Sequence, residues 1–300
     1  MILDKRVDGR TKLTGLIGNP VEHTVSPVIH NSLFSYLGIN GVYLPLKTEA
    51  TQLEAAVRGL AALGFTGFNV TIPYKEAICG LLDEADEEVK LLGTANTVRI
   101  RDGRLYGYNT DGTGFVTAFK KQTGTDFSGK KVCILGAGGT ARTLAVKVVQ
   151  EGAGRVCIIN RTVSKAEVIA GYINNRLSAG SGLREPVFTL MPGTERAREI
   201  LNSFDIIINT TSVGMFPNTD ASPVEDDVEF LSKPIVYDVI YNPAETRFLA
   251  AARQKGCRVF NGAGMLLWQG IRAFEIWMEI SVPDDVLQDL SASFLKCMEA

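Results

Sequence analysis

The chain has 300 residues, of which 45% are hydrophobic and 21% charged, with a formal net charge of −2. This is a globular composition with enough apolar material for two domains of ordinary size. The charge gives no general attraction to nucleic acid or to an anionic membrane. No apolar stretch is long enough to span a bilayer, and the N-terminus lacks the long apolar region of a signal peptide.

The five cysteines are odd in number and widely spread, and no metal-ligand spacing is present. Cys133 and Cys157 fall inside predicted buried strands, where a cysteine acts as small apolar filler. We therefore expect a reduced cytoplasmic protein without a metal.

Strand and helix signals alternate along the first half of the chain, which favours α/β layers with mostly parallel sheets. The sequence predicts strands at 14–17, 42–45 and 67–71, helices at 27–37, 51–63 and 111–121, and a strand pair over 91–108 that turns at Asp102-Gly103.

The second half continues the alternation. It predicts strands at 132–135, 155–159, 205–209, 234–240 and 258–260, a helix ending near Ser178, a polar loop at 178–184, a helix at 265–280 and a terminal helix. We expect a substrate-binding and catalytic domain at 1–110, a Rossmann domain at 111–263, and C-terminal helices at 264–300 that return to the first domain.

A glycine turn separates the strand at 132–135 from the next helix, reading Gly136-Ala137-Gly138-Gly139-Thr140-Ala141. Gly136 permits the turn, Gly138 lets the backbone approach a pyrophosphate, and the small Ala141 allows close packing. The helix N-terminus then offers free N–H groups and a partial positive charge. The order strand, turn, helix predicts a dinucleotide site rather than an ordinary glycine turn.

The next strand ends in Asn160-Arg161-Thr162, where a site for NAD usually has an acid for the ribose 2′-hydroxyl. Arg161 stands there instead, with Lys165 one helical turn on. Two cations suit a 2′-phosphate, so the favoured cofactor is NADP. The alternative is that Arg161 merely begins a solvated helix.

The first half has no nucleotide fingerprint, so we expect it to hold the substrate. Four polar clusters lie at its strand ends or helix starts, around Ser26, Lys75, Asn96 and Asp111. Thr24 and Ser26 alternate, so both hydroxyls could face one ligand. A lysine withdrawn from water beside a carboxylate would form the proton-handling pair that alcohol oxidation needs.

Each cluster also has a structural explanation. Ser26 before Pro27 is suited to cap a helix, and Asp111 could cap the helix that follows it. Asn96 could simply close a turn, and most lysines are surface charges.

At these residues the chain resembles the shikimate dehydrogenase family, which includes shikimate/quinate dehydrogenases, from about Gly15 to Gln269. The motifs that carry the resemblance are Asn-Pro-Val-Glu-His-Thr-Val-Ser-Pro-Val-Ile-His, Asn-Val-Thr-Ile-Pro-Tyr-Lys, Gly-Thr-Ala-Asn-Thr, Asn-Thr-Asp-Gly, Gly-Ala-Gly-Gly-Thr-Ala, Asn-Arg-Thr and Gly-Met-Leu-Leu-Trp-Gln.

The resemblance implies reversible NADPH-dependent reduction of 3-dehydroshikimate to shikimate, in aromatic amino acid (chorismate) biosynthesis. It implies a small-molecule substrate, no nucleic acid or membrane partner, and is compatible with a homodimer. It assigns catalysis to Lys75 and Asp111, and substrate binding to Thr24, Ser26, Thr71, Asn96, Asp111, Tyr241 and Gln269. It assigns cofactor binding to Gly136, Ala137, Gly138, Gly139, Thr140, Asn160, Arg161, Thr162, Lys165, Val239, Gly262 and Met265.

Two positions depart from the commonest pattern. Thr24 stands where serine is usual, which leaves quinate open as a substrate. Lys165 stands where arginine is usual, which replaces a bidentate fork by a point charge and leaves the strictness of NADP preference open. The alternatives are therefore a quinate/shikimate dehydrogenase with relaxed substrate or cofactor choice, and a non-catalytic regulatory binding protein. The retained Lys75 and Asp111 count against the second.

Overall fold

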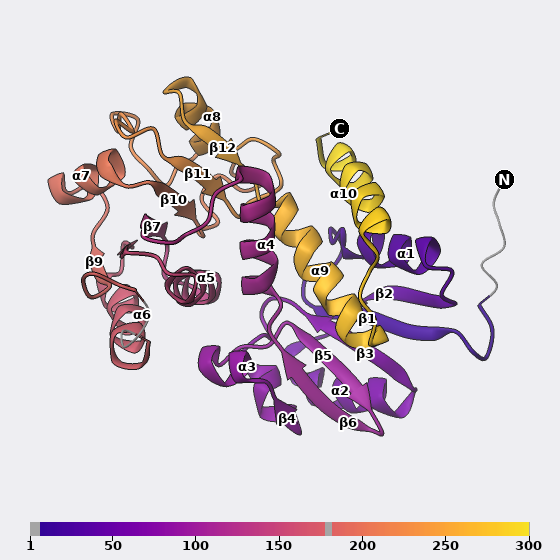
Figure 1. Ribbon diagram of the computed structural model, residues 1–300. Helices are drawn as coiled ribbons and strands as arrows, with labels where there is room; N and C mark the ends of the chain where they lie inside the picture. The colour runs from indigo at the N-terminus through magenta and orange to yellow at the C-terminus, as the bar shows by residue number, and fades with distance from the viewer. Residues whose placement is uncertain (1–6, 178–181, 300) are drawn as a thin grey trace. The chain divides into compact units, whose positions relative to one another are not determined.

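The computed structural model describes residues 7–177 and 182–299 (Figure 1). These residues divide into two compact units. Residues 7–114 and 266–297 form the first unit, and residues 115–265 form the second together with 298–299. Each unit is built on a six-stranded sheet.

The first sheet has the strand order β2-β1-β3-β5-β6-β4. Its strands are β1 (Lys12–Gly18), β2 (Gly41–Lys47), β3 (Phe65–Val70), β4 (Glu84–Ala85), β5 (Thr97–Arg101) and β6 (Arg104–Tyr108). β1 runs parallel to β2 and β3, whereas β5 runs antiparallel to its neighbours β3 and β6. The first sheet is therefore mixed, because a two-residue turn at Asp102-Gly103, both at positive φ, reverses the chain between β5 and β6.

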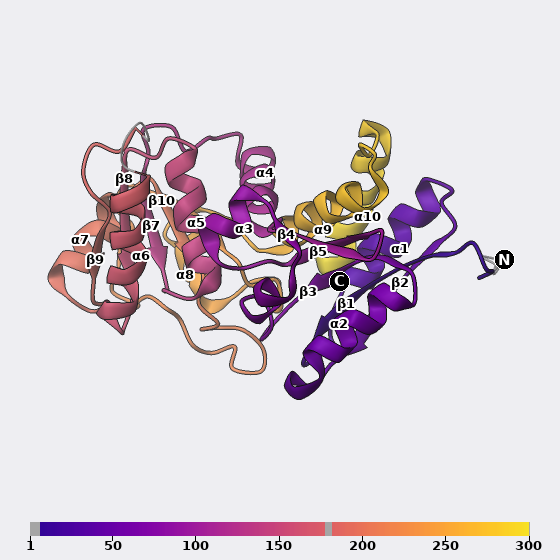
Figure 2. The same ribbon diagram turned by 90° about the horizontal axis from the view of Figure 1, so that it is seen from below.

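Helices cover both faces of this sheet. They are α1 (Ser26–Tyr36), α2 (Leu53–Ala62), α3 (Glu87–Leu92), α9 (Ala263–Met278) and α10 (Asp284–Glu299), with short 3₁₀ turns at Ala50–Gln52 and Ala77–Leu81. α2 packs Val57 and Leu60 against Ile17 and Phe68. On the opposite face Trp277 of α9 donates from Nε1 to the Val98 carbonyl at 3.0 Å. Figure 2 shows α2 on the other side of the sheet from α1 and α9.

The prediction of a strand pair starting at residue 91 is wrong in its first part. Leu91 and Leu92 end α3, and Gly93 closes that helix in the left-handed conformation at φ 69°. Asp86 caps the same helix by accepting from the Val89 N–H. The strand pair itself begins only at Thr97.

The second sheet is parallel throughout, in the order β12-β11-β10-β7-β8-β9. Its strands are β7 (Lys131–Leu135), β8 (Arg155–Ile159), β9 (Phe188–Leu190), β10 (Ile206–Asn209), β11 (Ile235–Asp238) and β12 (Arg258–Phe260). This is the doubly wound order of dinucleotide-binding folds, and the winding reverses between β10 and β7.

The helices of the second unit are α4 (Asp111–Thr123, whose first residues belong to the first unit), α5 (Gly139–Gln150), α6 (Val163–Arg176), α7 (Glu195–Ser203) and α8 (Arg247–Gln254). The short elements α7, α8 and β9 had no counterpart in the sequence prediction. Residue Ser178 and most of the polar loop predicted at 178–184 lie outside the described residues.

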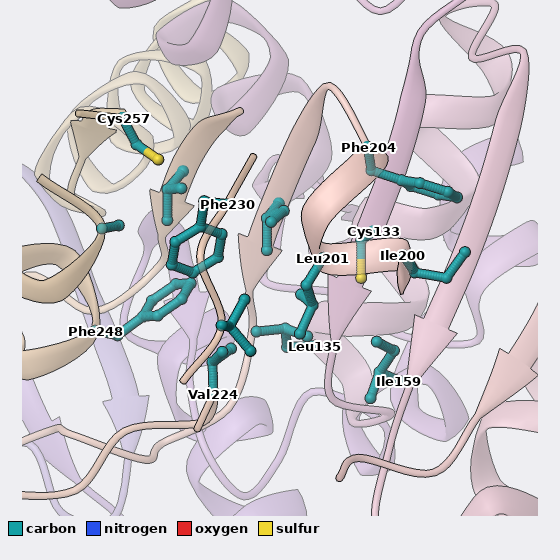
Figure 3. Packing of buried hydrophobic residues seen from close by; sticks show 14 of the residues in the cluster. Cys133, Leu135, Ile159, Ile200, Leu201, Phe204, Val224, Phe230, Phe248 and Cys257 are labelled. Atoms are coloured by element: carbon teal, nitrogen blue, oxygen red, sulfur yellow. The ribbon is translucent and has the colours of Figure 1, made fainter. Parts of the chain in front are cut away.

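One core of the second unit joins α7 and α8 to the sheet. Ile200 and Leu201 of α7 lie near Cys133 and Ile159, and Phe248 of α8 packs beside Phe230 in another part of the same cluster (Figure 3). Cys133 and Cys157 are fully buried with free thiols, as expected for apolar filler. Along β11 successive side chains point to opposite faces of the sheet. Tyr237 therefore points away from this core and packs with Phe115 and Phe119 of α4. Among the described residues no helix is both long and apolar enough to cross a membrane.

Candidate active site and cofactor site

The register of the first sheet brings the polar clusters around Lys75, Asn96 and Asp111 to one edge. Asn69 at the end of β3 pairs with Thr97 at the start of β5, and Thr97 pairs with Tyr108 at the end of β6. Three segments therefore lie at the same edge of the sheet: the segments that follow β3 and β6, and the segment that precedes β5. Asn96 belongs to this edge because β5 runs antiparallel, which strand ends alone could not predict.

Lys75 and Asp111 meet at this edge. Lys75 Nζ donates to Asp111 Oδ2 at 2.5 Å, and the two side chains are 30% and 13% exposed. The pair is thus largely withdrawn from water but still open on one side. Such a partly shielded ammonium and carboxylate can pass a proton to a ligand and keep a charge partner while doing so.

Asn96 is the centre of the hydrogen-bond network, so the interpretation that it merely closes a turn is wrong. Its Nδ2 lies 2.8 Å from Asp111 Oδ1, 2.9 Å from Thr110 Oγ1 and 3.3 Å from Gln269 Oε1. Its Oδ1 accepts from the Thr110 N–H at 2.7 Å. The side chain is buried, and its hydrogen bonds fix the carboxylate that Lys75 contacts.

Asp111 begins α4 but its carboxylate does not cap that helix. Asn109 Oδ1 accepts from the Asp111 N–H at 3.1 Å, while the Asp111 carboxylate turns to Lys75 and Asn96. The capping alternative is therefore wrong, and the carboxylate is free for chemistry. Gln269 of α9 is also buried, and its Nε2 donates to the Leu266 carbonyl.

Ser26 likewise does not cap α1. The structure places Val25 at the cap with no side-chain hydrogen bond, and Ser26 in the first turn beside Pro27. Instead, Thr24 Oγ1 lies 3.2 Å from Ser26 Oγ and accepts from the Ser26 N–H at 3.3 Å. The two hydroxyls therefore hydrogen-bond to each other, and their role in substrate binding stays a prediction.

Thr71 follows β3 at the same edge. Its N–H donates to the Ile17 carbonyl at 3.0 Å, and its carbonyl accepts from the Tyr74 N–H. These bonds fix the turn that leads to Lys75, and the Thr71 side chain is partly exposed.

Sequence reasoning missed the buried support beneath these residues. Asn69 donates from Nδ2 to the Asn96 carbonyl and to Thr97 Oγ1, both at 3.1 Å. Tyr43 of β2 donates its hydroxyl to Asn69 Oδ1 at 2.8 Å. The sequence signal for this support was Asn69 itself, a single polar residue between the apolar Phe68 and Val70 of a buried strand.

The glycine turn of the second unit combines a strained backbone position with two uncrowded glycines. Gly136 adopts φ +109°, which a side chain would strain, and a Cβ there would lie 2.7 Å from Thr210 Oγ1. By contrast, a Cβ on Gly138 or Gly139 would meet nothing within 4 Å. α5 begins at Gly139 and has no side-chain hydrogen bond at its cap, so no capping side chain satisfies its first N–H groups.

The cationic residues after β8 are placed to extend this site. Asn160 Nδ2 donates to the Thr162 carbonyl at 2.8 Å and shapes the turn. Arg161 and Lys165 are exposed, and within the described residues neither pairs with an acid. Ala137 and Thr140 are partly exposed in the glycine turn. These residues fit a dinucleotide with a phosphate on its adenosine ribose.

The remaining predicted cofactor residues lie at the ends of β11 and β12. The Gly262 N–H donates to the Ile240 carbonyl at 3.0 Å, and a Cβ on Gly262 would lie only 1.9 Å from the Val239 carbonyl oxygen. Met265 is partly buried in α9. Tyr241 follows β11, and burial raises the pKa of its phenol. Within the described residues, no group of three His, Cys, Asp or Glu side chains could hold a metal ion.

A partly buried Lys–Asp pair at one sheet edge and a glycine-rich turn on a doubly wound sheet together define a nucleotide-dependent oxidoreductase of two α/β domains. Three family models match the chain: "Shikimate dehydrogenase substrate binding domain" over residues 16–98, "Shikimate / quinate 5-dehydrogenase" over 118–219, and "Shikimate 5'-dehydrogenase C-terminal domain" over 262–289. The chain belongs to the shikimate dehydrogenase family.

Relatives extend over nearly the whole chain. The shikimate dehydrogenase (NADP(+)) of Methanopyrus kandleri is 42% identical over 99% of this chain and 100% of its own. The structure of shikimate 5-dehydrogenase from Listeria monocytogenes in complex with shikimate and NAD is 35% identical, with a TM-score of 0.85 over 96% of this chain and 99% of that one. The Thermus thermophilus enzyme, in complex with NADP(H) and shikimate, is 31% identical, with a TM-score of 0.81 over 95% and 100%.

Proposed function

We propose that this protein is an NADP-dependent shikimate dehydrogenase, which reversibly reduces 3-dehydroshikimate to shikimate. The observation that carries the proposal is the Lys75–Asp111 pair, held by Asn96 at an edge rich in hydroxyl and amide groups. Family membership and the NADP(+)-dependent relatives support the same reaction.

Residues of the first unit would bind and orient the substrate. The Thr24 and Ser26 hydroxyls, 3.2 Å apart, would bind its carboxylate. Thr71, Asn96 and Gln269 would bind the ring hydroxyls. The family resemblance also assigns substrate binding to Tyr241.

Lys75 would move the proton. In the reducing direction its ammonium donates a proton to the oxygen of the substrate carbonyl as negative charge develops there, and Asp111 holds the ammonium in place. In the oxidising direction the neutral amine accepts the hydroxyl proton. NADPH, when bound, would supply the hydride to the carbonyl carbon. NADPH and Lys75 together would thus add a hydride and a proton across the C=O bond.

The second unit would bind the cofactor. The glycine turn at 136–140 and the start of α5 would take the pyrophosphate, and Arg161 with Lys165 would take the 2′-phosphate. Asn160 and Thr162 would shape the ribose site, while Val239, Gly262 and Met265 would border the nicotinamide. We further propose a cytoplasmic enzyme without a nucleic-acid partner, and we consider a homodimer compatible with this role.

A panel of shikimate or quinate with NADP or NAD tests the proposal. We expect NADP reduction with shikimate to have a kcat/KM far above that of the other three combinations. Equal or greater efficiency with quinate would instead favour the second candidate, a quinate/shikimate dehydrogenase. This candidate remains open because Thr24 carries a methyl group where serine is usual. If calorimetry shows shikimate binding but no combination turns over, the protein is a binding protein.

A further inference from the structure

The second unit contains a buried carboxylate that the proposed chemistry does not use. Asp238 ends β11 and is fully buried. In a doubly wound sheet the dinucleotide crosses the carboxyl edge at the reversal between β10 and β7. Because Arg161 after β8 marks the side of the adenosine ribose, the nicotinamide end must lie over the ends of β10, β11 and β12. Asp238 is directly beneath that end.

Asp238 receives hydrogen bonds from donors on three different segments. Its Oδ1 accepts from Asn209 Nδ2 at 3.0 Å and from the Ile240 N–H at 3.1 Å. Its Oδ2 accepts from Thr246 Oγ1 at 2.8 Å. A carboxylate, which has acceptors only, satisfies all three donors at once. An amide would place its N–H groups opposite the Thr246 hydroxyl, which would then have to accept and give up its hydrogen bond to this side chain.

The hydrogen bonds continue into the loops on either side. Asn209 Oδ1 accepts from the Thr211 N–H and hydroxyl at 3.0 and 2.7 Å, and Thr211 Oγ1 accepts from the Val213 N–H at 3.2 Å. The Val239 N–H donates to the Asn209 carbonyl at 3.0 Å. One buried carboxylate therefore connects the loop after β10 to the loop after β11.

Keeping this group ionised has a cost to the fold. Burial raises the pKa of Asp238 from 3.8 to about 6, against the lowering effect of its hydrogen bonds. Because the folded-state pKa is raised, this group stabilises the folded protein less as pH rises from about 4 through 6. The causes of its shift include no charged side chain, and the titratable neighbour is Tyr237, whose phenol pKa Asp238 helps to raise.

We infer that Asp238 is a positioning residue for the cofactor, whose carboxylate aligns the loops after β10 and β11 that border the nicotinamide. The inference rests on the proposed NADP-dependent function. Asp238 touches neither ligand in this account and acts through Asn209, the Ile240 N–H and Thr246.

The first test replaces the carboxylate by an isosteric amide, Asp238→Asn. At pH 7.5 we expect NADPH affinity, measured by calorimetry, or kcat to fall by about 10-fold or more, the value of a lost charge-assisted hydrogen bond. Below pH 6 the wild-type group is neutral too, so the difference between the two proteins should shrink. The cofactor 2′-phosphate titrates near the same pH but affects both proteins equally. Shikimate affinity of the binary complex should not change.

A second set of variants keeps the test valid if Asp238→Asn does not fold. Thr246 caps α8 by accepting from the Leu249 N–H, so Thr246→Val removes both a cap and a donor to Asp238. Thr194→Val is the matched control, since Thr194 caps α7 by accepting from the Ala197 N–H and does not contact Asp238. We expect similar losses of thermal stability, but a loss of NADPH affinity or kcat only in Thr246→Val, rescued by Thr246→Ser.

The outcomes separate this inference from the proposed function. If wild-type protein fails to reduce NADP with shikimate, the proposed function fails. If wild type is active and Asp238→Asn has the same NADPH affinity and kcat at pH 7.5, Asp238 is only structural. Where Asp238→Asn does not fold, the same result with Thr246→Val leads to the same conclusion.

Discussion

The sites at the two sheet edges of this protein consist of different chemical groups. At the edge of the first sheet, buried side chains satisfy one another: Asn96 binds Asp111, which binds Lys75. At the edge of the second sheet the site is backbone and exposed charge. There α5 begins without a side-chain cap, and Arg161 and Lys165 project into solvent.

The difference follows from what each site must recognise. A pyrophosphate needs only N–H groups and positive charge, which any helix N-terminus with glycines can supply. A ring with several hydroxyls and one reacting carbon needs donors and acceptors at fixed positions. Substitutions at the first edge should therefore affect turnover most, and substitutions at the second should affect cofactor affinity most.

The largest effect is expected for Lys75→Ala. Loss of general acid–base catalysis should lower kcat by roughly 100-fold or more, while the KM for shikimate changes much less because other side chains still hold the ring. Steady-state kinetics at saturating NADP measure both constants. Lys12→Ala, an exposed lysine at the start of β1, is the control and should behave as wild type. A raised KM with kcat nearly intact would mean that Lys75 only binds.

The next effect is expected for Arg161→Ala. A charge-assisted contact to phosphate is worth about 1.5–3 kcal/mol, so NADP affinity should fall about 10- to 150-fold, with a much smaller loss for NAD. Calorimetry with each cofactor measures the ratio. Arg176→Ala, at the C-terminal end of α6, the helix that begins two residues after Arg161, should leave both affinities unchanged. Equal losses for NADP and NAD in Arg161→Ala would make Arg161 structural.

A smaller effect is expected for Lys165→Arg. The exposed lysine offers a point charge, and arginine would offer a fork that matches phosphate geometry. Because exposed charge pairs contribute about 0.2–1 kcal/mol, the preference for NADP over NAD should rise by no more than about fivefold. The ratio of kcat/KM values with the two cofactors measures it. A reduced preference would place Lys165 away from the 2′-phosphate.

A similarly small effect is expected for Thr24→Ser. The change removes one methyl group and keeps the hydroxyl that lies 3.2 Å from Ser26 Oγ. One methylene-sized group is worth about 0.8 kcal/mol, so kcat/KM for shikimate relative to quinate should rise about fourfold. Competition between the two substrates gives the ratio directly, and no change would mean that the Thr24 methyl does not discriminate between them.

The second sheet was the easier one to predict from sequence. Each of its βα units is local: the strand at 131–135, the turn at Gly136 and the helix from Gly139 are consecutive. The short helices α3, α7 and α8 were missed although each has a capping residue, Asp86, Thr194 and Thr246. Their apolar patterns are only two turns long, too short to separate from loops.

The first site could be predicted only in its residues and not in its geometry. Asn96 reaches the site because β5 is antiparallel, and strand direction is a property of the whole sheet. Ser26 was ambiguous because a serine before proline suits a cap, yet the helix begins one residue earlier than that role requires. Asp238 gave no signal, because a buried acid and an exposed acid after a strand look alike in sequence.

A crossed binding experiment tests the division between the two edges most directly. It measures binary affinities for shikimate and for NADPH in wild type, Ser26→Ala and Arg161→Ala by calorimetry. We predict that Ser26→Ala weakens shikimate binding by about 5- to 10-fold, the value of a hydrogen bond, and leaves NADPH unchanged. We predict that Arg161→Ala weakens NADPH binding alone. Loss of shikimate affinity in Arg161→Ala, or loss of NADPH affinity in Ser26→Ala, would contradict the account.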